Sequence, residues 1–587
     1  MTLATFFERF DTFADAPDAV AKMRELVLHL AVTGKLVGQN SSDESGELLL
    51  KRINAERLAA VKSRQISPMK PLPDVGEDEL LFELQPGWAV ARLIELVMEI
   101  QTGPFGSTLH KSDYQLGGTP VINPASLKDG KIVPIEAMAI GHATLKRLEG
   151  FKLKAGNIVM ARRGEMGRCA IVTEMEDGWL CGTGSLVLRM PRSIYAPFLA
   201  MLIGAPMART YLGGASVGTT MQNLNQSILA KMPVGVPPLA EQRRIVAKVD
   251  ELMALCDRLE AQQQERQTRH ADLSRASLAR FADAPTPANL HFLFHKSYPI
   301  PPGDLRKSIL TLAVQGKLVP QDPKDESAED FLSRLDLKST VDYPDCAEED
   351  NRLPPSWIRV RFEDIALVSG GVTLGRKLGE KKTVTLPYLR VANVKRGEID
   401  LTTIKEVSIG ESEIERYALR ENDLLMTEGG DWDKVGRAAI WRSEIPVCLH
   451  QNHVFRARMR SVEILPFWFE RYFNSPIGRS YFESASKQTT NLASINMRQV
   501  RSCPIPLPPL AEQRRIVAKV DHLMALVDAL ETQLATSRAT AKNLLEAAVA
   551  ELTAADSLSP PIETAIQPRN SAVLDKRQVS RQKLRAQ

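Results

Sequence analysis

The chain has few cysteines and no long apolar run. Its 587 residues include only 6 cysteines, which are scattered and form no Cys-x-x-Cys pair. Neither a disulfide framework nor a structural zinc site is therefore indicated. No stretch approaches the roughly 18 consecutive apolar residues of a membrane span, and the first residues include acids where a signal peptide needs a basic and then an apolar run. These absences predict a cytoplasmic protein.

Catalytic motifs are missing as well. Gly34-Lys35-Leu36 and its copy at Gly316 are similar to the end of a phosphate-binding loop, but no Ser or Thr follows the lysine and no Gly lies five residues earlier. Asn123-Pro124 begins like an adenine-methyltransferase motif but lacks the second proline and the aromatic residue, which favours a turn. No helicase motif and no nuclease carboxylate–lysine cluster is visible in the sequence. We expect a binding protein rather than an enzyme.

Cys448, His450 and His453 lie close together and are residue types that ligate metals. Along a strand, alternation directs Cys448 and His450 to one face and His453 to the other, and the sequence has no second ligand cluster. A structural role is favoured over a metal site, and no metal is expected.

The sequence repeats itself. PPLAEQRRIVAKVDELMAL at 237–255 returns at 508–526 with one change, Glu251 to His522, and LHLAVTGKLV at 28–37 returns at 310–319 as LTLAVQGKLV. A weaker pair surrounds Trp88 and Trp357. Each half therefore consists of a short amphipathic helix, a polar linker, a long variable segment and a long helix.

The repeat predicts eight parts. They are an N-terminal helical element at 1–40, a linker at 41–85, a variable module at 86–236, a long helix at 237–282, a second helical element with linker at 283–354, a second module at 355–507, a second long helix at 508–553 and a disordered tail at 554–587. The first module has 15 Lys and Arg against 10 Asp and Glu, and the second has 23 against 18, so each carries a net charge of +5. The rest of the chain has a net charge of −6, so two basic modules are attached to an acidic frame.

The long helices have apolar residues at alternating steps of three and four, as in a coiled coil. The seam consists of Ile245, Val249, Leu252, Cys256 and Leu259 in the first helix and Ile516, Val520, Leu523, Val527 and Leu530 in the second. We expect the two helices to pack against each other, each about 60 Å long if it has about 40 residues. The alternative is that each packs on its own module. Arg243, Arg244 and Lys248 are interpreted as a solvated face with ion pairs, in preference to a nucleic-acid site.

Both variable modules have an α+β pattern. Strands are predicted at 157–161, 185–189, 423–427 and 453–456, and helices at 196–211 and 466–483. Loops rich in Gly, Gln, Asn, Thr, Lys and Arg separate them. Such side chains contact phosphates and base edges of DNA, although turn chemistry alone is the alternative for any single loop.

Together these motifs resemble the specificity subunit of Type I restriction-modification systems. The resemblance lies in the repeated PPLAEQRRIV helices, in PYLRVANVKRGEIDL, RYALRENDLLMTEGG and VGRAAI of the second module, and in QTGPFGS of the first. The first module departs from the family pattern where VINPASLKDGKI replaces the LRVANV form. The resemblance implies two globular target-recognition domains joined by two long antiparallel coiled-coil helices, with a pseudo-two-fold internal repeat.

The resemblance also implies a non-catalytic DNA-reading subunit. Each recognition domain would bind one half of a bipartite, asymmetric DNA sequence, while the helices set the spacing and dock two methyltransferase subunits. Motor-nuclease subunits would complete the complex, and S-adenosylmethionine, ATP and Mg would bind those partners only, leaving this chain without a cofactor. A coiled-coil scaffold joining protein-binding modules is the alternative, and a fused restriction enzyme ranks last because its motifs are absent.

Loop position and side-chain type select the candidate DNA-binding residues. In the first module these are Gly103, Ser107, Arg162, Arg163, Thr219, Thr220, Gln222 and Asn223. In the second they are Thr373, Arg376, Arg390, Asn393, Trp432, Lys434, Gln488, Thr489 and Asn491.

Overall fold

The computed structural model describes residues 3–554, except 9, 11–15, 77–78, 81, 106–107, 215–223, 296, 342–352, 378, 380–381, 431–433 and 490–491. The predicted tail at 554–587 therefore lies, after its first residue, outside the described residues. The chain forms two compact units, one of residues 1–264 and 537–587 and the other of residues 265–536. Among the described helices, none is both long and apolar enough to cross a membrane.

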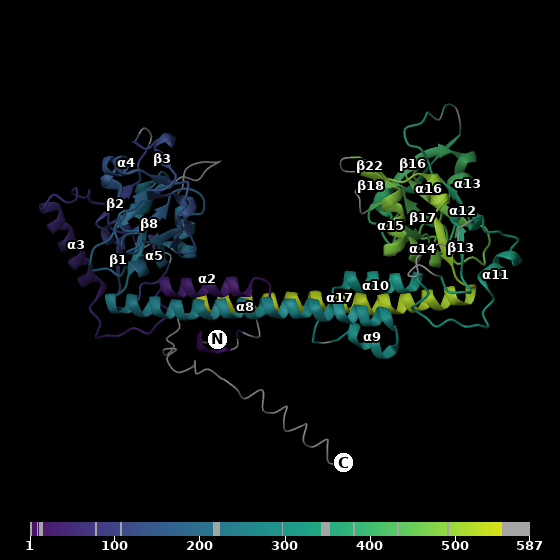
Figure 1. The fold of residues 1–587 in the computed structure, drawn as a ribbon, viewed down its shortest axis with the longest axis horizontal. Helices are drawn as coiled ribbons and strands as arrows, with labels where there is room; N and C mark the ends of the chain where they lie inside the picture. The colour runs from purple at the N-terminus through teal and green to yellow at the C-terminus, as the bar shows by residue number, and fades with distance from the viewer. Residues whose placement is uncertain are drawn as a thin grey trace, which may run out of the picture. The chain divides into compact units, whose positions relative to one another are not determined.

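The first unit contains the first variable module (Figure 1). Its central sheet is antiparallel, in the order β2 (Glu99–Thr102), β11 (Ser185–Arg189), β8 (Ile158–Ala161) and β9 (Cys169–Ile171). A second sheet has the order β10 (Leu180–Cys181), β4 (Thr119–Ile122), β7 (Ala139–Ile140) and β3 (Tyr114–Gln115), with β10 and β4 parallel. Strand β1 (Ala89–Arg92) pairs with β12 (Pro233–Val236), so the two ends of the module are neighbours. The smaller elements are β5 (Leu127–Lys128), β6 (Lys131–Ile132), α4 (His142–Arg147) and α7 (Gln226–Lys231).

The second unit repeats this topology in a different sequence. Its central sheet has the order β14 (Ala366–Ser369), β21 (Val454–Met459), β17 (Leu424–Thr427) and β19 (Ala438–Ile440), and the second sheet has β16 (Lys405–Gly410), β15 (Thr383–Leu389) and β20 (Leu449–His450). Strands β15 and β20 are parallel, like β4 and β10. Strand β13 (Ile358–Arg361) pairs with β24 (Pro504–Leu507) and brings the module ends together. The other elements are α12 (Phe362–Ile365), α13 (Ile414–Tyr417), α16 (Met497–Arg501) and a sheet of β18 (Gly429–Gly430), β23 (Leu492–Ser494) and β22 (Lys487–Thr489).

Each module has two short helices where the sequence predicted one. Helix α5 (Ala196–Gly204) is followed by α6 (Pro206–Gly214), and α14 (Pro466–Asn474) by α15 (Pro476–Ala485). The predicted helices 196–211 and 466–483 are therefore each broken at a proline. The residue before that proline, Ala205 or Ser475, has extended backbone angles, because the proline ring excludes the helical conformation for its predecessor.

The segment 41–85, expected as a linker, contains the helix α3 (Gly46–Lys62). Ser45 caps it by accepting a hydrogen bond from the backbone N–H of Leu48. The buried side chain of Arg57 fixes the helix to the module, since its guanidinium donates to the carbonyl oxygens of Ile94 and Val97. The shorter helices α1 (Leu3–Glu8) and α2 (Ala19–Val32) precede it, while α9 (Pro287–Leu293), α10 (Pro302–Val314) and α11 (Ala328–Arg334) lie in the second unit.

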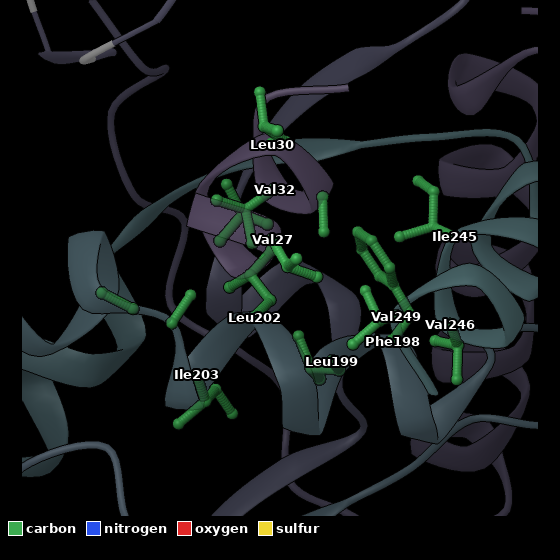
Figure 2. Packing of buried hydrophobic residues seen from close by; sticks show 14 of the residues in the cluster. Val27, Leu30, Val32, Phe198, Leu199, Leu202, Ile203, Ile245, Val246 and Val249 are labelled. Atoms are coloured by element: carbon green, nitrogen blue, oxygen red, sulfur yellow. The ribbon is translucent and has the colours of Figure 1, made fainter. Parts of the chain in front are cut away.

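Two helices of 45 residues each, α8 (Leu239–Asp283) and α17 (Leu510–Ala554), follow the modules. The predicted seam residues are buried, apart from Leu259 and Leu530, which are partly buried. In the first unit, the beginning of α8 packs on α2 and α5, as Figure 2 shows for Val249, Val27 and Phe198, and the same core contains Leu545 and Leu552 of α17. In the second unit, the beginning of α17 shares a core with Phe281 of α8. The packing of the start of α8 on its own module, the alternative considered from the sequence, is therefore found. Direct packing of the two long helices on each other stays a prediction.

The repeated motifs of the first unit meet in one cluster, which we call the first joint: Gly34, Gln39, Trp88 and Glu241. Gly34 ends α2 with φ of +74°, and a Cβ there would lie 2.8 Å from Cζ2 of Trp88. The indole Nε1 of Trp88 and the amide Nε2 of Gln39 both donate to Oε1 of Glu241, at 3.0 and 2.8 Å. The similarity of Gly34-Lys35 to a phosphate-binding loop thus has a structural explanation, because the glycine supplies a left-handed helix end.

The second joint has the same construction from Gly316, Gln321, Trp357 and Glu512. Gly316 has φ of +70° and lies against Trp357. Trp357 donates to Oε2 of Glu512 at 2.9 Å, and Gln321 donates to Oε1 at 2.5 Å. Burial raises the pKa of both glutamates.

Ion pairs surround both joints. Arg244 pairs with Asp43 at 2.6 Å, Arg515 with Asp325 at 2.6 Å, and Lys248 with Glu251 at 2.9 Å. The guanidinium of Arg243 lies 5.8 Å from the ring centre of Tyr195. The ion-pair interpretation of the Arg and Lys residues at the start of α8 is confirmed for Arg244 and Lys248.

Candidate nucleic-acid interface

Four segments of the first module meet at one end of its central sheet. They follow β2, β4 and β8 and include the turn between β10 and β11; we call this end the first edge. The N–H of Gly182 donates to the carbonyl of Ile122 at 2.9 Å, which joins the turn to the end of β4. The N–H of Arg162 donates to the carbonyl of Gly184 at 2.8 Å, which joins the same turn to the end of β8.

The second module has an equivalent second edge, formed by the segments after β14, β15 and β17 and the turn between β20 and β21. The N–H of Gln451 donates to the carbonyl of Leu389 at 2.9 Å, and the N–H of Glu428 donates to that of His453 at 3.0 Å. These two bonds correspond to the pair in the first edge. The backbone frame is therefore shared, while the side chains on it differ.

A glycine is required at one position of each edge. A Cβ on Gly103, directly after β2, would lie 2.1 Å from the carbonyl oxygen of Gly182. A Cβ on Gly371, after β14, would lie 1.9 Å from the carbonyl oxygen of His450. Such separations are far shorter than any real contact, so these glycines let two backbones approach closely. Gly103, predicted as a DNA-binding residue, is buried and acts through its backbone.

The polar loops predicted to bind DNA are attached to the same edges. The N–H of Leu224, directly after residues 215–223, donates to the carbonyl of Arg162 at 2.8 Å. The N–H of Ile495, directly after β23, donates to the carbonyl of Glu428 at 2.9 Å. Strands β18, β23 and β22 continue this attachment in the second module.

The predicted residues of the first module that can be placed gather at the first edge. Arg163 is exposed, with its Cδ 3.8 Å from where a Cβ of Gly184 would lie. Arg162 is half-buried, and its Nε donates to the carbonyl of Leu224 at 3.0 Å. Burial, reinforced by the charge of Arg163, lowers the pKa of Arg162. Five predicted residues lie outside the described ones: Ser107, Thr219, Thr220, Gln222 and Asn223.

In the second module, Thr373 is exposed in the loop after β14. Arg376, further along this loop, forms an ion pair with Glu413 at 2.8 Å and lies over the ring of Tyr417. Lys434 is half-buried beside Gly430. Gln488 and Thr489 belong to β22, whereas Trp432 and Asn491 lie outside the described residues.

Asn393 has a structural position that argues against its selection as a base-contacting residue. Its side chain accepts from the N–H of Arg390 at 3.0 Å and donates to the carbonyls of Asp400 and Thr403 at 2.8 and 3.1 Å. Asn393 is only 3% exposed, so its amide is used within the module. Arg390 is half-buried, and its guanidinium donates to the carbonyl of Thr403 at 2.9 Å.

Glu428 and His453 also lie on the second edge, and they are absent from the residues predicted to bind DNA. Their side chains meet at 2.7 Å between Oε2 and Nδ1, with 30% and 54% of the side chains exposed. One signal was available in the sequence, because aligning the strand IVMARRG with LLMTEGG places Glu428 opposite Arg162. Sequence reasoning considered His453 only as a metal ligand.

The Cys448–His453 segment has separate partners for its two histidines. His450 is buried, and its Nδ1 bonds to the carbonyl of Val454 at 2.7 Å; burial lowers its pKa to about 4. Cys448 is buried in the core between β15 and β17, and burial raises the pKa of its thiol to about 12. In the part of the chain that the structure describes, no group of three His, Cys, Asp or Glu residues is arranged to hold a metal ion.

The chain thus has two modules of one topology that present different polar edges. The family model for the Type I restriction modification DNA specificity domain matches residues 87–267 and again 354–537, and the chain belongs to this family.

Individual relatives agree over most of the chain. The Type I restriction enzyme EcoAI specificity subunit of Escherichia coli is 29% identical over 576 residues, covering 90% of this chain and 93% of that protein. The EcoEI specificity subunit of Escherichia coli is 27% identical over 565 residues, with the same coverage of each. The crystal structure of the HsdS subunit from Thermoanaerobacter tengcongensis, 20% identical, aligns with 82% of this chain and 100% of that one at a TM-score of 0.41.

Proposed function

We propose that this chain is the DNA sequence-recognition subunit of a Type I restriction-modification complex, in which each module reads one half of a bipartite, asymmetric site. The observation that carries the proposal is the equivalence of the two edges. The same backbone bonds recur in both modules, yet Arg162 occupies in the first the position that Glu428 occupies in the second. One scaffold with two different sets of side chains is suited to reading two different base sequences.

Charge supports DNA as the ligand. Each module carries a net charge of +5 on a frame of −6, which favours approach of the modules to the phosphate backbone. The chain would act where chromosomal DNA lies, in the cytoplasm.

We assign the chemistry to partner subunits. Methylation of adenine would belong to two methyltransferase subunits that bind S-adenosylmethionine, and cleavage to motor-nuclease subunits that use ATP and Mg. This chain would bind none of these cofactors and would supply sequence recognition only. Membership of a family of DNA specificity domains supports this division.

The long helices would form an antiparallel coiled coil that sets the spacing of the half-sites and docks the methyltransferase subunits. Within each unit, the first part of one helix shares a core with the last part of the other, which is the pairing that antiparallel helices require. A helix of 45 residues is about 68 Å long, whereas successive major-groove faces on one side of B-DNA are about 34 Å apart.

Mapping methylated adenines tests the proposal. The chain is expressed with its methyltransferase in cells that lack other adenine methylation, and methylated positions are read by sequencing. A two-part motif with a fixed gap is expected. Identical methylation with and without this chain would overturn the proposal, as would a DNA affinity that does not change with salt, which a protein-binding scaffold predicts.

A further inference from the structure

Glu428 lies at the centre of the second edge. It follows β17 directly, its N–H donates to the carbonyl of His453 at 3.0 Å, and its carbonyl accepts from Ile495 at 2.9 Å. The turn that contains His453 is bonded through Gln451 to the end of β15, directly before Arg390. Its backbone is therefore fixed between segments selected independently for DNA binding.

The side chain of Glu428 is held in place and remains accessible. Its Oε2 lies 2.7 Å from Nδ1 of His453, while 30% of the side chain stays exposed. Asn452, adjacent to His453, donates its N–H to the carbonyl of Val372 at 3.0 Å, which joins this turn to the loop bearing Thr373. The turn whose His453 holds the carboxylate is therefore bonded to the segments that carry Thr373 and Arg390.

A carboxylate is an unusual group on a surface that faces DNA. It only accepts hydrogen bonds and is repelled by phosphates, so contact with the backbone is unfavourable. The donors in the major groove are the exocyclic amino groups of cytosine and adenine. A carboxylate pairs typically with N4 of cytosine, whereas the bidentate contact to adenine needs an amide that both donates and accepts.

We propose that Glu428, positioned by His453, reads the N4 amino group of a cytosine in the half-site bound by the second module. His453 fixes one carboxylate oxygen, which leaves the other to accept from the base. The first module has Arg162 at the equivalent backbone position and the exposed Arg163 beside it. Arginine pairs with guanine, so the two modules would differ in the base that they prefer at this position.

This inference rests on the proposed function, and Glu428→Gln tests it in the complete complex with the methyltransferase. Gln has the same shape but adds a donor and removes the charge. We expect the methylated motif to keep its first half and to change at one base pair of its second half, a pair that is G·C for the wild-type chain. The matched control is Glu463→Gln: Glu463 is 43% exposed and follows β21, at the opposite end of the central sheet. Its motif should remain that of the wild type.

Binding to a panel of DNA duplexes gives the second measurement. Replacing the G·C pair by A·T should weaken wild-type binding roughly 10- to 100-fold and should weaken binding of the Glu428→Gln complex much less. The panel also decides the matter if the variant methylates too little DNA to map. The inference about Glu428 would be overturned by an unchanged methylation motif, or by equal losses of DNA affinity for the wild-type and Glu428→Gln complexes at every position. Either result would leave the proposed function standing. If the wild-type chain directs no two-part motif, the proposed function fails instead.

Discussion

The indole N–H of Trp88 donates to Oε1 of Glu241 at 3.0 Å, and 153 residues separate the two along the chain. Trp88 comes directly before the first strand of the first module, and Glu241 lies in the first turn of α8, which follows the last strand. This hydrogen bond therefore links the residue before the first strand of the module to the helix that follows its last strand. Trp357 and Glu512 form the same connection in the second unit, at 2.9 Å.

Replacing either tryptophan by phenylalanine should destabilise its unit. Trp88→Phe removes the donor and leaves a buried carboxylate with one partner fewer, which costs about 1–3 kcal/mol. The urea midpoint should fall, and Trp357→Phe should act similarly on the second unit. A variant as stable as the wild type would show that the hydrogen bond contributes nothing net.

Replacing the buried Glu241 or Glu512 by the uncharged glutamine should change the free energy of unfolding by different amounts. Burial raises the pKa of Glu241, so its folded form holds a proton more tightly than its unfolded form. The contribution of Glu241 to the free energy of unfolding is therefore fully present at pH values below its pKa in the unfolded chain. This contribution is lost as the pH rises through its higher pKa in the folded chain. Because Oε2 of Glu241 has no hydrogen-bond partner among the described residues, Glu241→Gln should raise stability at pH 8 and have little effect near pH 4.

Glu512→Gln is the matched control for that change. Both oxygens of Glu512 accept hydrogen bonds, from Gln321 and Trp357, so an amide must lose one acceptor. The Glu512→Gln variant should therefore gain less stability at pH 8 than the Glu241→Gln variant. Urea unfolding of both variants at the two pH values measures the difference, and equal gains would contradict the assignment of hydrogen bonds.

Gly370 and Gly371 should differ sharply in their tolerance of alanine. A Cβ on Gly371 meets a backbone oxygen at 1.9 Å, whereas the nearest atom to one on Gly370 is the flexible Met497 Cε at 3.5 Å. Gly371→Ala should cost roughly 2–4 kcal/mol, since backbone has to move, and Gly370→Ala less than about 1 kcal/mol. Thermal unfolding of the two neighbours would reveal whether the close approach is real.

Arg390 and Asn393 should separate recognition from stability. Arg390→Ala should impair recognition of the second half-site alone, with little loss of stability. Asn393→Ala removes three hydrogen bonds inside the module and should destabilise it by about 2–4 kcal/mol. Methylation mapping and urea unfolding are measured on both variants. Equal loss of recognition at both half-sites for Arg390→Ala would contradict modular reading.

Arg163 should contribute to the salt dependence of DNA binding. If it contacts a phosphate, Arg163→Ala should reduce the slope of log K against log salt by about 1. Arg192, exposed beyond the opposite end of β11, is the control, and Arg192→Ala should leave the slope unchanged. The idea fails if the two variants have the same slope.

Sequence reasoning succeeded where the signal was local or repeated. The strands predicted at 157–161 and 423–427 are found at 158–161 and 424–427, because alternation is visible within a single segment. The long helices predicted from 237 and 508 begin at Leu239 and Leu510, because Pro-Leu helix starts are equally local. The breaks at Pro206 and Pro476 were also visible and were overlooked. Helix α3 was missed because Arg57, a residue expected at the surface, anchors it from a buried position.

The candidate interface was harder to predict than the fold. Loop composition selected residues that the fold brings to the two edges, among them Arg162, Arg163, Thr373 and Arg390, and their contact with DNA stays a prediction. It could not distinguish the side chain of Asn393, used inside the module, from an amide facing solvent, because that depends on the carbonyls of Asp400 and Thr403. Glu428 was overlooked because an acid does not fit a search for phosphate contacts.

Strand β1 pairs with β12, and β13 pairs with β24. The chain therefore enters and leaves each module at neighbouring positions. Everything between the paired strands can lengthen, shorten or change sequence without displacing the helix that follows. Evolution can therefore alter what a module reads while the frame remains constant, which is consistent with near-identical helix starts following two modules of dissimilar sequence.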